Sequence, residues 1–208
     1  MNTFCRIRRV FLVLIFLAAS CGAQETYFPP KVFGEGKRAE FDDDINSFLL
    51  KRLEEPSLFT TARNNKSAEV YRFLWFRTFH NPIAVRMDVR PDGTSLLTTK
   101  VADGHAGFPR TVTKLIQSTT RSLTREQTET FRRKVTTEGF WKAVSRDTGG
   151  PAATDCDGWI VEGVHNGNYH VVERAVPNRK PSTSKLVQSL GRALANELGQ
   201  MDMPKDER

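Results

Sequence analysis

Cysteine is scarce in this chain of 208 residues, which contains only Cys5, Cys21 and Cys156. Three cysteines over this length do not form the dense framework of small disulfide-stabilised domains. A long hydrophobic run is also missing. The most apolar stretch, residues 10–19, has ten residues, whereas a helix needs roughly 20 to cross a bilayer. The sequence therefore predicts neither a disulfide scaffold nor a membrane-spanning helix.

Familiar catalytic and nucleotide-binding signatures are absent as well. The sequence has no Gly-x-Ser-x-Gly nucleophile elbow and no His-Glu-x-x-His metal motif. The glycine-rich segment 103–107 (Asp-Gly-His-Ala-Gly) lacks the Gly-Lys-Ser/Thr ending of a phosphate-binding loop and does not fit the dinucleotide fingerprint. We interpret it as a flexible connector, and we predict no cofactor and no metal site.

The first 20 residues are typical of a secretory signal. Three arginines within residues 6–9 precede the apolar run, and the small residues 18–20 (Ala-Ala-Ser) stand directly before Cys21. A charged region, a short apolar region and a small-residue ending in this order mark an export signal. We therefore expect a chain that works outside the cytoplasm.

Two processing routes compete at this site. The ending before Cys21 resembles the bacterial lipobox, in which the cysteine is acylated and becomes the new N-terminus, although Ala18 stands where leucine is usual. The alternative is cleavage by ordinary signal peptidase after Ala23, which leaves a soluble periplasmic or secreted protein. We expect the lipoprotein route, which holds the chain on a membrane surface through a lipid on Cys21. Cys156 is then a lone thiol. Under the alternative route, a disulfide between Cys21 and Cys156 can form.

The mature chain has the size of one domain. Removal of the first 20 residues leaves 188, and loss of the three signal arginines lowers the formal charge from +7 to +4. The remaining basic residues are interspersed with acidic ones, so a nucleic-acid partner is not predicted. We expect a flexible tether over residues 21–40, one domain over 41–199 and a disordered tail over 200–208.

Apolar spacing predicts three helices. The first covers residues 41–54 and ends before Pro56. The second begins at a capping box formed by Thr124 and Gln127 and continues to about residue 137. The third covers residues 183–198, where leucine recurs every four residues.

Six further segments are predicted strands. The Asn166-Gly167 dipeptide between the last two is a strong hairpin signal. The resulting order predicts an α+β fold, an antiparallel sheet of about six strands with three helices packed mainly on one face. The expected strands cover residues 71–79, 83–90, a threonine-rich stretch from the turn at 91–93 to about 102, 112–122, 159–165 and 169–176.

The aromatic run at residues 71–79 allows two interpretations. Its side chains could line a ligand groove, or the run could be a central strand buried on both faces, since such strands lose polar alternation. We prefer the second interpretation because each aromatic residue buries a large area. The run contains Tyr71, Phe73, Leu74, Trp75, Phe76 and Phe79.

The hairpin at residues 155–174 carries the densest polar chemistry, and its register decides which groups meet. A two-residue loop, pairing Val164 with Tyr169 or His165 with His170, puts Glu162 on the face of Tyr169 and away from His170. A three-residue loop, pairing His165 with Tyr169, puts Glu162, His170 and Arg174 on one face. These three are the candidate catalytic residues, and the alternative is a salt-bridged sheet face. The hairpin set is Asp155, Asp157, Glu162, His165, His170, Glu173 and Arg174.

Three motifs carry a resemblance over roughly residues 70–198. They are Tyr71-Arg72-Phe73-Leu74-Trp75, then Thr78-Phe79-x-x-Pro82-x-x-Val85-Arg86, then Trp159-x-x-Glu162-Gly163-x-x-x-Gly167-x-Tyr169-His170-x-Val172-x-Arg174. Together they resemble an uncharacterised family of exported bacterial proteins, a domain of unknown function. The resemblance implies an exported compartment and a shared fold, and it implies no activity and no role for any residue.

Two classes of function remain after these exclusions. The first is a non-catalytic exported envelope protein that binds a protein, a peptide or a small ligand. The second is a small extracytoplasmic hydrolase that uses the carboxylates and histidines of the 155–174 hairpin. We favour the first, because an active site needs convergent groups in a concave pocket and no motif here requires convergence.

Overall fold

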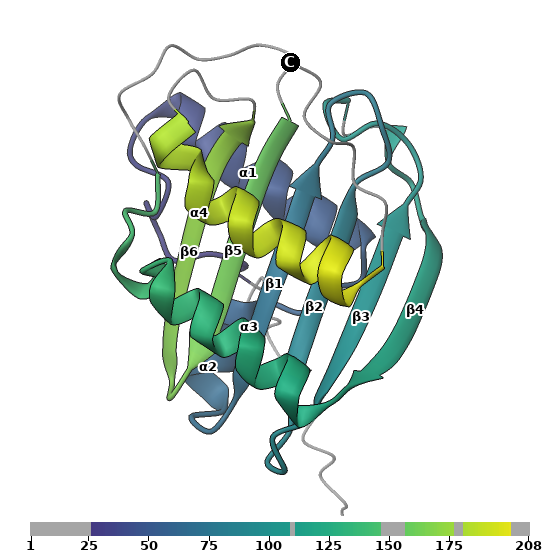
Figure 1. The fold of residues 1–208 in the computed structure, drawn as a ribbon. Helices are drawn as coiled ribbons and strands as arrows, with labels where there is room; N and C mark the ends of the chain where they lie inside the picture. The colour runs from purple at the N-terminus through teal and green to yellow at the C-terminus, as the bar shows by residue number, and fades with distance from the viewer. Residues whose placement is uncertain (1–25, 109–110, 147–156, 177–180, 201–208) are drawn as a thin grey trace, which may run out of the picture.

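The computed structural model describes residues 26–108, 111–146, 157–176 and 181–200. Six strands form one antiparallel sheet in the order β4-β3-β2-β1-β5-β6 (Figure 1). The predicted antiparallel sheet is thereby confirmed, with ends that shift by a few residues. The strands are β1 (Glu69–Phe76), β2 (Ile83–Val89), β3 (Ser95–Ala102), β4 (Leu115–Leu123), β5 (Asp157–His165) and β6 (Asn168–Val176).

Four α-helices accompany the sheet in the described residues, one more than predicted. The missed helix, α2 (Leu58–Asn64), has only seven residues, too few to display an apolar period. It begins where the Ser57 hydroxyl accepts a hydrogen bond from the Thr60 amide. The others are α1 (Lys37–Arg52), α3 (Arg125–Thr137) and α4 (Pro181–Arg192). Helix α3 has the predicted capping box and is followed by the 3-10 turn η2 (Phe140–Lys142). Helix α4 continues as the π-helical η3 (Ala193–Leu198).

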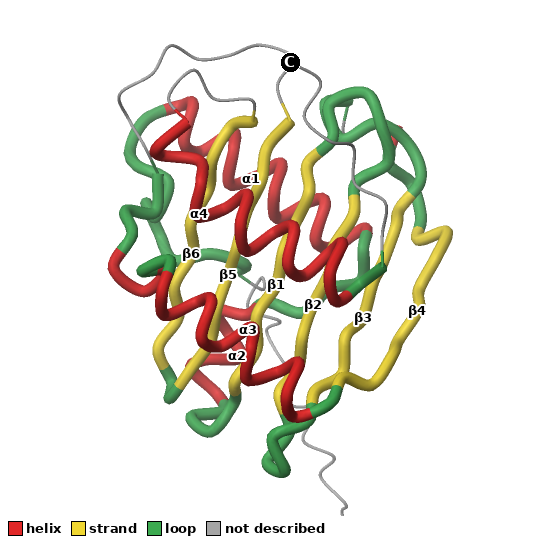
Figure 2. The backbone as a smooth tube through the Cα atoms, viewed as in Figure 1, coloured by secondary structure: helices red, strands yellow, loops and turns green. Residues whose placement is uncertain are grey.

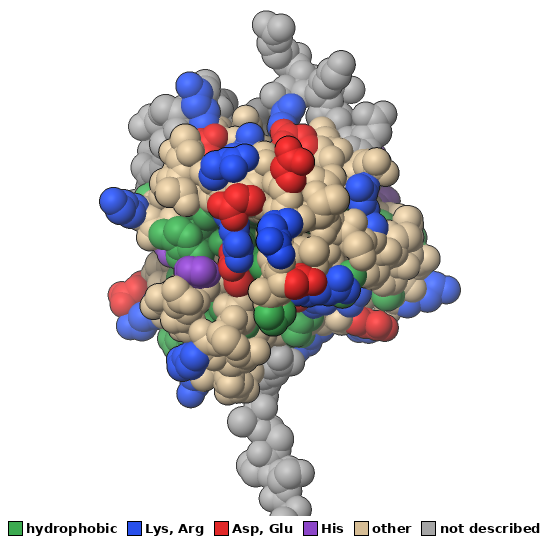
Figure 3. Space-filling model, turned by 60° about the horizontal axis from the view of Figure 1, so that its bottom comes forward, with side chains coloured by type: hydrophobic (Ala, Val, Ile, Leu, Met, Phe, Trp, Pro, Cys, Tyr) green, Lys and Arg blue, Asp and Glu red, His purple; other side chains and the backbone are tan. Residues whose placement is uncertain are grey.

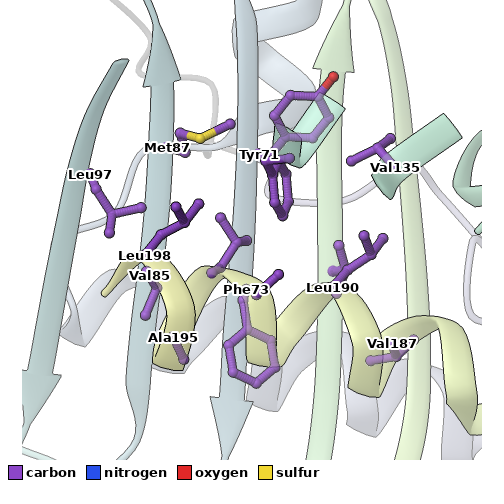
Figure 4. Packing of buried hydrophobic residues seen from close by; sticks show 14 of the residues in the cluster. Tyr71, Phe73, Val85, Met87, Leu97, Val135, Val187, Leu190, Ala195 and Leu198 are labelled. Atoms are coloured by element: carbon purple, nitrogen blue, oxygen red, sulfur yellow. The ribbon is translucent and has the colours of Figure 1, made fainter. Parts of the chain in front are cut away.

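The helices lie on both faces of the sheet, so the prediction of helices mainly on one face is wrong. Figures 1 and 2 show α3 and α4 in front of the strands and α1 and α2 behind them. The physical reason is that β1 is apolar on both of its faces, and each face needs a covering layer. Its first face packs against α3 and α4 (Figure 4), and its second face packs against α1.

The interpretation of the aromatic run as a central strand is confirmed. Tyr71, Phe73 and Trp75 are buried on the face of α4, and Leu74 is buried on the face of α1. Phe79 is the exception, because it lies beyond the end of β1 and is 51% exposed.

The prediction of a flexible tether over residues 21–40 is wrong for residues 26–40. Tyr27, Phe28 and Phe33 are buried in the core cluster beneath α1, and the Tyr27 hydroxyl donates to the backbone oxygen of Glu55 at 3.0 Å. Isolated aromatic residues without a period gave no signal of this packing. Helix α1 also begins at Lys37, four residues earlier than predicted, and turns Phe41 outward.

Several predictions fall on residues outside the described ranges. These are the signal at 1–20, the processing site at Cys21, the hairpin residue Asp155, Cys156, and the tail from residue 201. Among the described residues, no helix is both long enough and apolar enough to cross a membrane.

Candidate functional site

The β5–β6 hairpin has a two-residue turn, which settles the register. Asn166 and Gly167 both adopt positive φ angles, 52° and 73°, the backbone that tight hairpins of this kind require. Val164 therefore pairs with Tyr169, and Glu162 pairs with Val171. As expected for this loop length, Glu162 lies on the face of Tyr169, whereas His170 and Arg174 lie on the opposite face. The three candidate catalytic residues are not brought together.

Glu162 is fully buried and already has partners. Its Oε2 lies 2.7 Å from the Nε of Arg72 on the neighbouring strand β1, and its Oε1 accepts from the Tyr169 hydroxyl at 2.9 Å. Arg72 is also fully buried, and it donates to the backbone oxygen of Pro56 at 2.7 Å. Burial is the largest single influence and lowers the pKa of Arg72, but the attraction of Glu162 and Glu55 and the hydrogen bond to Glu162 together raise this pKa above its ordinary value. Glu162 therefore serves as the counter-ion of a structural arginine.

A second buried carboxylate extends this network. Glu55, in the corner between α1 and α2, lies 3.4 Å from Arg72, 3.3 Å from Arg86 and 3.3 Å from Lys100. Asp88 pairs with Arg86 at 3.0 Å, so three basic groups meet three carboxylates. We call these residues, Glu55, Arg72, Arg86, Asp88, Lys100 and Glu162, the buried charge network, whose outermost member, Asp88, is 39% exposed. It joins the α1–α2 corner to the sheet.

On the opposite face, His170 packs against aromatic rings. Its ring centroid lies 5.0 Å from that of Phe140 and 6.3 Å from that of Trp141. Burial lowers the pKa of His170 below its ordinary value, which makes its imidazole neutral at pH 7. Backbone hydrogen bonds to Phe140 and Ala143 act in the opposite direction, and the net effect still lowers the pKa.

Arg174 and Glu173 have structural contacts. Arg174 donates to the backbone oxygens of Val144 and Ser145, at 3.0 and 3.2 Å. On the other face of β6, Glu173 lies 3.5 Å from Arg146. These contacts hold the segment after η2 along the edge of β6. Asp157 begins β5, and its side chain lies outside the described part of the structure.

A surface groove of about 390 Å³ lies beside these histidines. Its volume falls within the ~300 to 1,000 Å³ range of ligand sites. Trp141 and His165 lie within it with ring centroids 6.4 Å apart. Figure 3 shows histidine side chains beside a hydrophobic patch on this end of the molecule. We call it the hairpin groove, and it is lined by Trp141, His165, Asn168, Tyr169 and His170.

Charged residues of β1 and α3 fix the position of His165 at the edge of the hairpin groove. The Nδ1 of His165 lies 3.6 Å from a carboxylate oxygen of Glu69. Arg132 donates to Glu69 at 2.8 Å, and the Tyr71 hydroxyl donates to it at 3.1 Å. His165 itself remains 46% exposed, so its imidazole can contact a ligand.

Sequence reasoning missed Trp141, the largest side chain in the hairpin groove. The signal that could have found it is Gly163, a glycine in the interior of β5, because such a glycine often marks a close approach. A Cβ at Gly163 would lie 2.7 Å from the Phe140 ring and 3.1 Å from the Trp141 ring. Glycine at this position therefore lets both rings pack closely against the strand.

The segment 103–107 serves as a connector, and its start is held firmly. The carboxylate of Asp103 accepts hydrogen bonds from the backbone amides of Thr113 and Lys114, at 2.7 and 2.9 Å. These bonds lower the pKa of Asp103 to about 2. Within the segment, the amides of Ala106 and Gly107 donate to the backbone oxygens of Arg77 and Thr78, at 3.2 and 3.0 Å, so the chain itself engages them.

Comparison with known proteins gives no assignment. No protein-family model matches the chain, and no curated protein matches it. The resemblance to exported bacterial proteins therefore stays a prediction. Among the described residues, no group of three or more His, Cys, Asp or Glu side chains is placed to hold a metal ion.

Proposed function

We propose that the protein is a non-catalytic exported binding protein and that the hairpin groove is its ligand site. The observation that carries this proposal is the partly exposed indole of Trp141 with two histidines, His165 and His170, in one concave surface. Trp75 and Trp159, by contrast, are 3% and 4% exposed. An indole left at the surface beside hydrogen-bonding groups is typical of a recognition site.

The lining favours a flat ligand with polar edges, and a sugar ring of a glycan has this chemistry. Trp141 contributes apolar ring atoms that suit the C–H groups of a sugar ring, and Asn168 offers hydrogen bonds to hydroxyl or acetamido groups. The His165 Nε2 lies 3.0 Å from the exposed Asn166 amide nitrogen, and in the proposed complex it exchanges this partner for the ligand. The groove is open at the surface and mixed in polarity, whereas sites for compact apolar ligands are enclosed. An extended oligosaccharide therefore fits it better than an apolar molecule does.

The hydrolase alternative loses the pair of Glu162 and His170 in this geometry. Glu162 is buried beneath α2 and paired with Arg72, and His170 faces the other side of the sheet. A general acid and a general base must both reach the substrate. Glu162 and His170 do not share a surface from which they reach one substrate.

Titration with the tetramer of N-acetylglucosamine, followed by tryptophan fluorescence, tests the binding proposal. We expect a saturable change in emission, because Trp141 is the one tryptophan of three that solvent reaches. His165→Ala should weaken binding about tenfold, the effect of losing one or two hydrogen bonds worth roughly 1.4 kcal/mol in total. His80→Ala, at another exposed histidine, is the matched control and should bind as the unchanged protein does.

Equal weakening by both histidine changes would contradict the assignment of the groove. Absence of any saturable response, with the fold intact by circular dichroism, would contradict the glycan class. Release of shorter oligosaccharides during incubation, detected by mass spectrometry, would show that the protein is an enzyme.

We further propose that the mature protein begins at an acylated Cys21 and is held on the cell envelope by that lipid. The small-residue ending before Cys21 supports this location. Mass spectrometry should find a diacylated or triacylated N-terminal cysteine in the membrane fraction, and Cys21→Ser should release exported protein into the soluble fraction. A mature N-terminus at Gln24 in the unchanged protein would defeat this proposal.

A further inference from the structure

The two edges of the sheet differ in how they are protected. The edge of β6 is covered by the segment after η2. There the Glu173 amide donates to the backbone oxygen of Ser145 at 2.8 Å, and the backbones of Arg146 and Glu173 form an isolated parallel β-bridge. The edge of β4 has no such cover among the described residues. Strand β4 is last in the sheet and pairs only with β3. In Figure 1 no helix passes in front of it.

Strand β4 also has few of the features that normally prevent edge pairing. Natural edge strands are short, or carry lysine or proline, or are twisted away by bulges. Strand β4 has nine residues, no proline, no lysine and a single charged residue, Arg121, in a protein with 26% charged residues. Its pairing with β3 shifts where Gln117 faces Val101 and Leu115 faces Ala102, so Ile116 is an extra residue and the regular part of the strand begins at Gln117. The side chains from Ile116 to Thr120 are all exposed.

We propose that β4 is a dimerisation edge, on which β4 of a second copy pairs in antiparallel orientation. The pairing joins two six-stranded sheets into one sheet of twelve strands. A twofold symmetric antiparallel pair must have one residue opposite itself, and in the proposed register this is Thr119, the middle of the regular segment 117–121. This interface is independent of the hairpin groove, which lies at the other edge of the sheet.

The sequence of β4 suits this register, which is why a second copy fits better than an unrelated peptide. Reading outward from Thr119, Ser118 faces Thr120 of the second copy, and Gln117 faces Arg121 of the second copy. Hydroxyl pairs and an amide beside a guanidinium are favourable cross-strand neighbours. The two arginines are offset by four residues, about 13 Å along the strand, so their repulsion is screened.

Engineered disulfides test the interface and its register in the full chain. Thr119→Cys should form a disulfide-linked dimer on a non-reducing gel, because directly facing Cα atoms lie about 4.5 to 5.5 Å apart. Gln117→Cys alone should not crosslink, whereas Gln117→Cys mixed with Arg121→Cys should. Thr130→Cys, at an exposed position of α3, and the unchanged chain with its native cysteines are the controls.

Sedimentation gives a second, independent readout. The unchanged chain should sediment as a dimer, and Thr119→Lys should sediment as a monomer with an unchanged circular dichroism spectrum, since Thr119 is exposed. The proposal is overturned if Thr119→Cys crosslinks no better than Thr130→Cys. It is equally overturned if the unchanged chain is monomeric at ~100 μM, or if Gln117→Cys alone crosslinks best, because the register would then be wrong.

Discussion

Replacing Arg72 with alanine is expected to lower the free energy of unfolding by about 3 to 5 kcal/mol, because it leaves buried carboxylates without their counter-ion. Glu162 and Glu55 are both buried, and Arg72 contacts both at 2.6 and 3.4 Å. A loss of this size is a large part of the roughly 5 to 15 kcal/mol that stabilises a typical domain. Urea unfolding followed by circular dichroism measures it.

A matched arginine provides the control for this prediction. Arg133→Ala removes an exposed guanidinium from α3, and its effect should stay within about 0.5 kcal/mol. If Arg72→Ala costs no more than Arg133→Ala, the buried charge network does not hold the α1–α2 corner. The structural role assigned to Arg72 and Glu162 would then be wrong.

Trp75→Ala is expected to cost about 3 to 5 kcal/mol, since it opens a cavity in the central strand. Trp75 is 3% exposed, and its ring centroid lies 6.0 Å from that of the buried Trp159. Phe79→Ala is the matched control from the same aromatic run, because Phe79 is 51% exposed and should lose less than 1 kcal/mol. Thermal unfolding of both variants gives the comparison. A Trp75→Ala variant that melts normally but loses ligand would show that the run lines a groove.

The strands and long helices could be predicted because each carries its own local signal. The capping box of Thr124 and Gln127 is present as predicted, and the Asn166-Gly167 turn joins β5 to β6. The aromatic content of β1 indicated a strand buried on both faces. The same observation implies helices on both faces of the sheet, since a strand that is buried on both faces needs a covering layer on each. That implication was available in the sequence, and the one-face prediction did not follow it.

Other features depend on tertiary contacts that no local pattern contains. Helix α2 is too short for a period, and Tyr27, Phe28 and Phe33 are buried only because α1 folds over them. Arg72 is fully buried in an otherwise apolar strand. Its partner Glu162 is 90 residues later in the sequence, and no local sequence pattern predicts this pair. The hairpin groove depends in the same way on Trp141, which reaches the hairpin only after α3 has packed on the sheet.

The most direct test of the central claim is an NMR titration of the isotopically labelled protein with the N-acetylglucosamine tetramer. The indole N–H resonance of Trp141 and the imidazole resonances of His165 and His170 should shift together and saturate, because all three side chains line the hairpin groove. The indole resonances of Trp75 and Trp159 should stay unchanged, since both rings lie in the core. Shifts that saturate at another surface while these three resonances do not move would contradict the assignment of the hairpin groove as the ligand site.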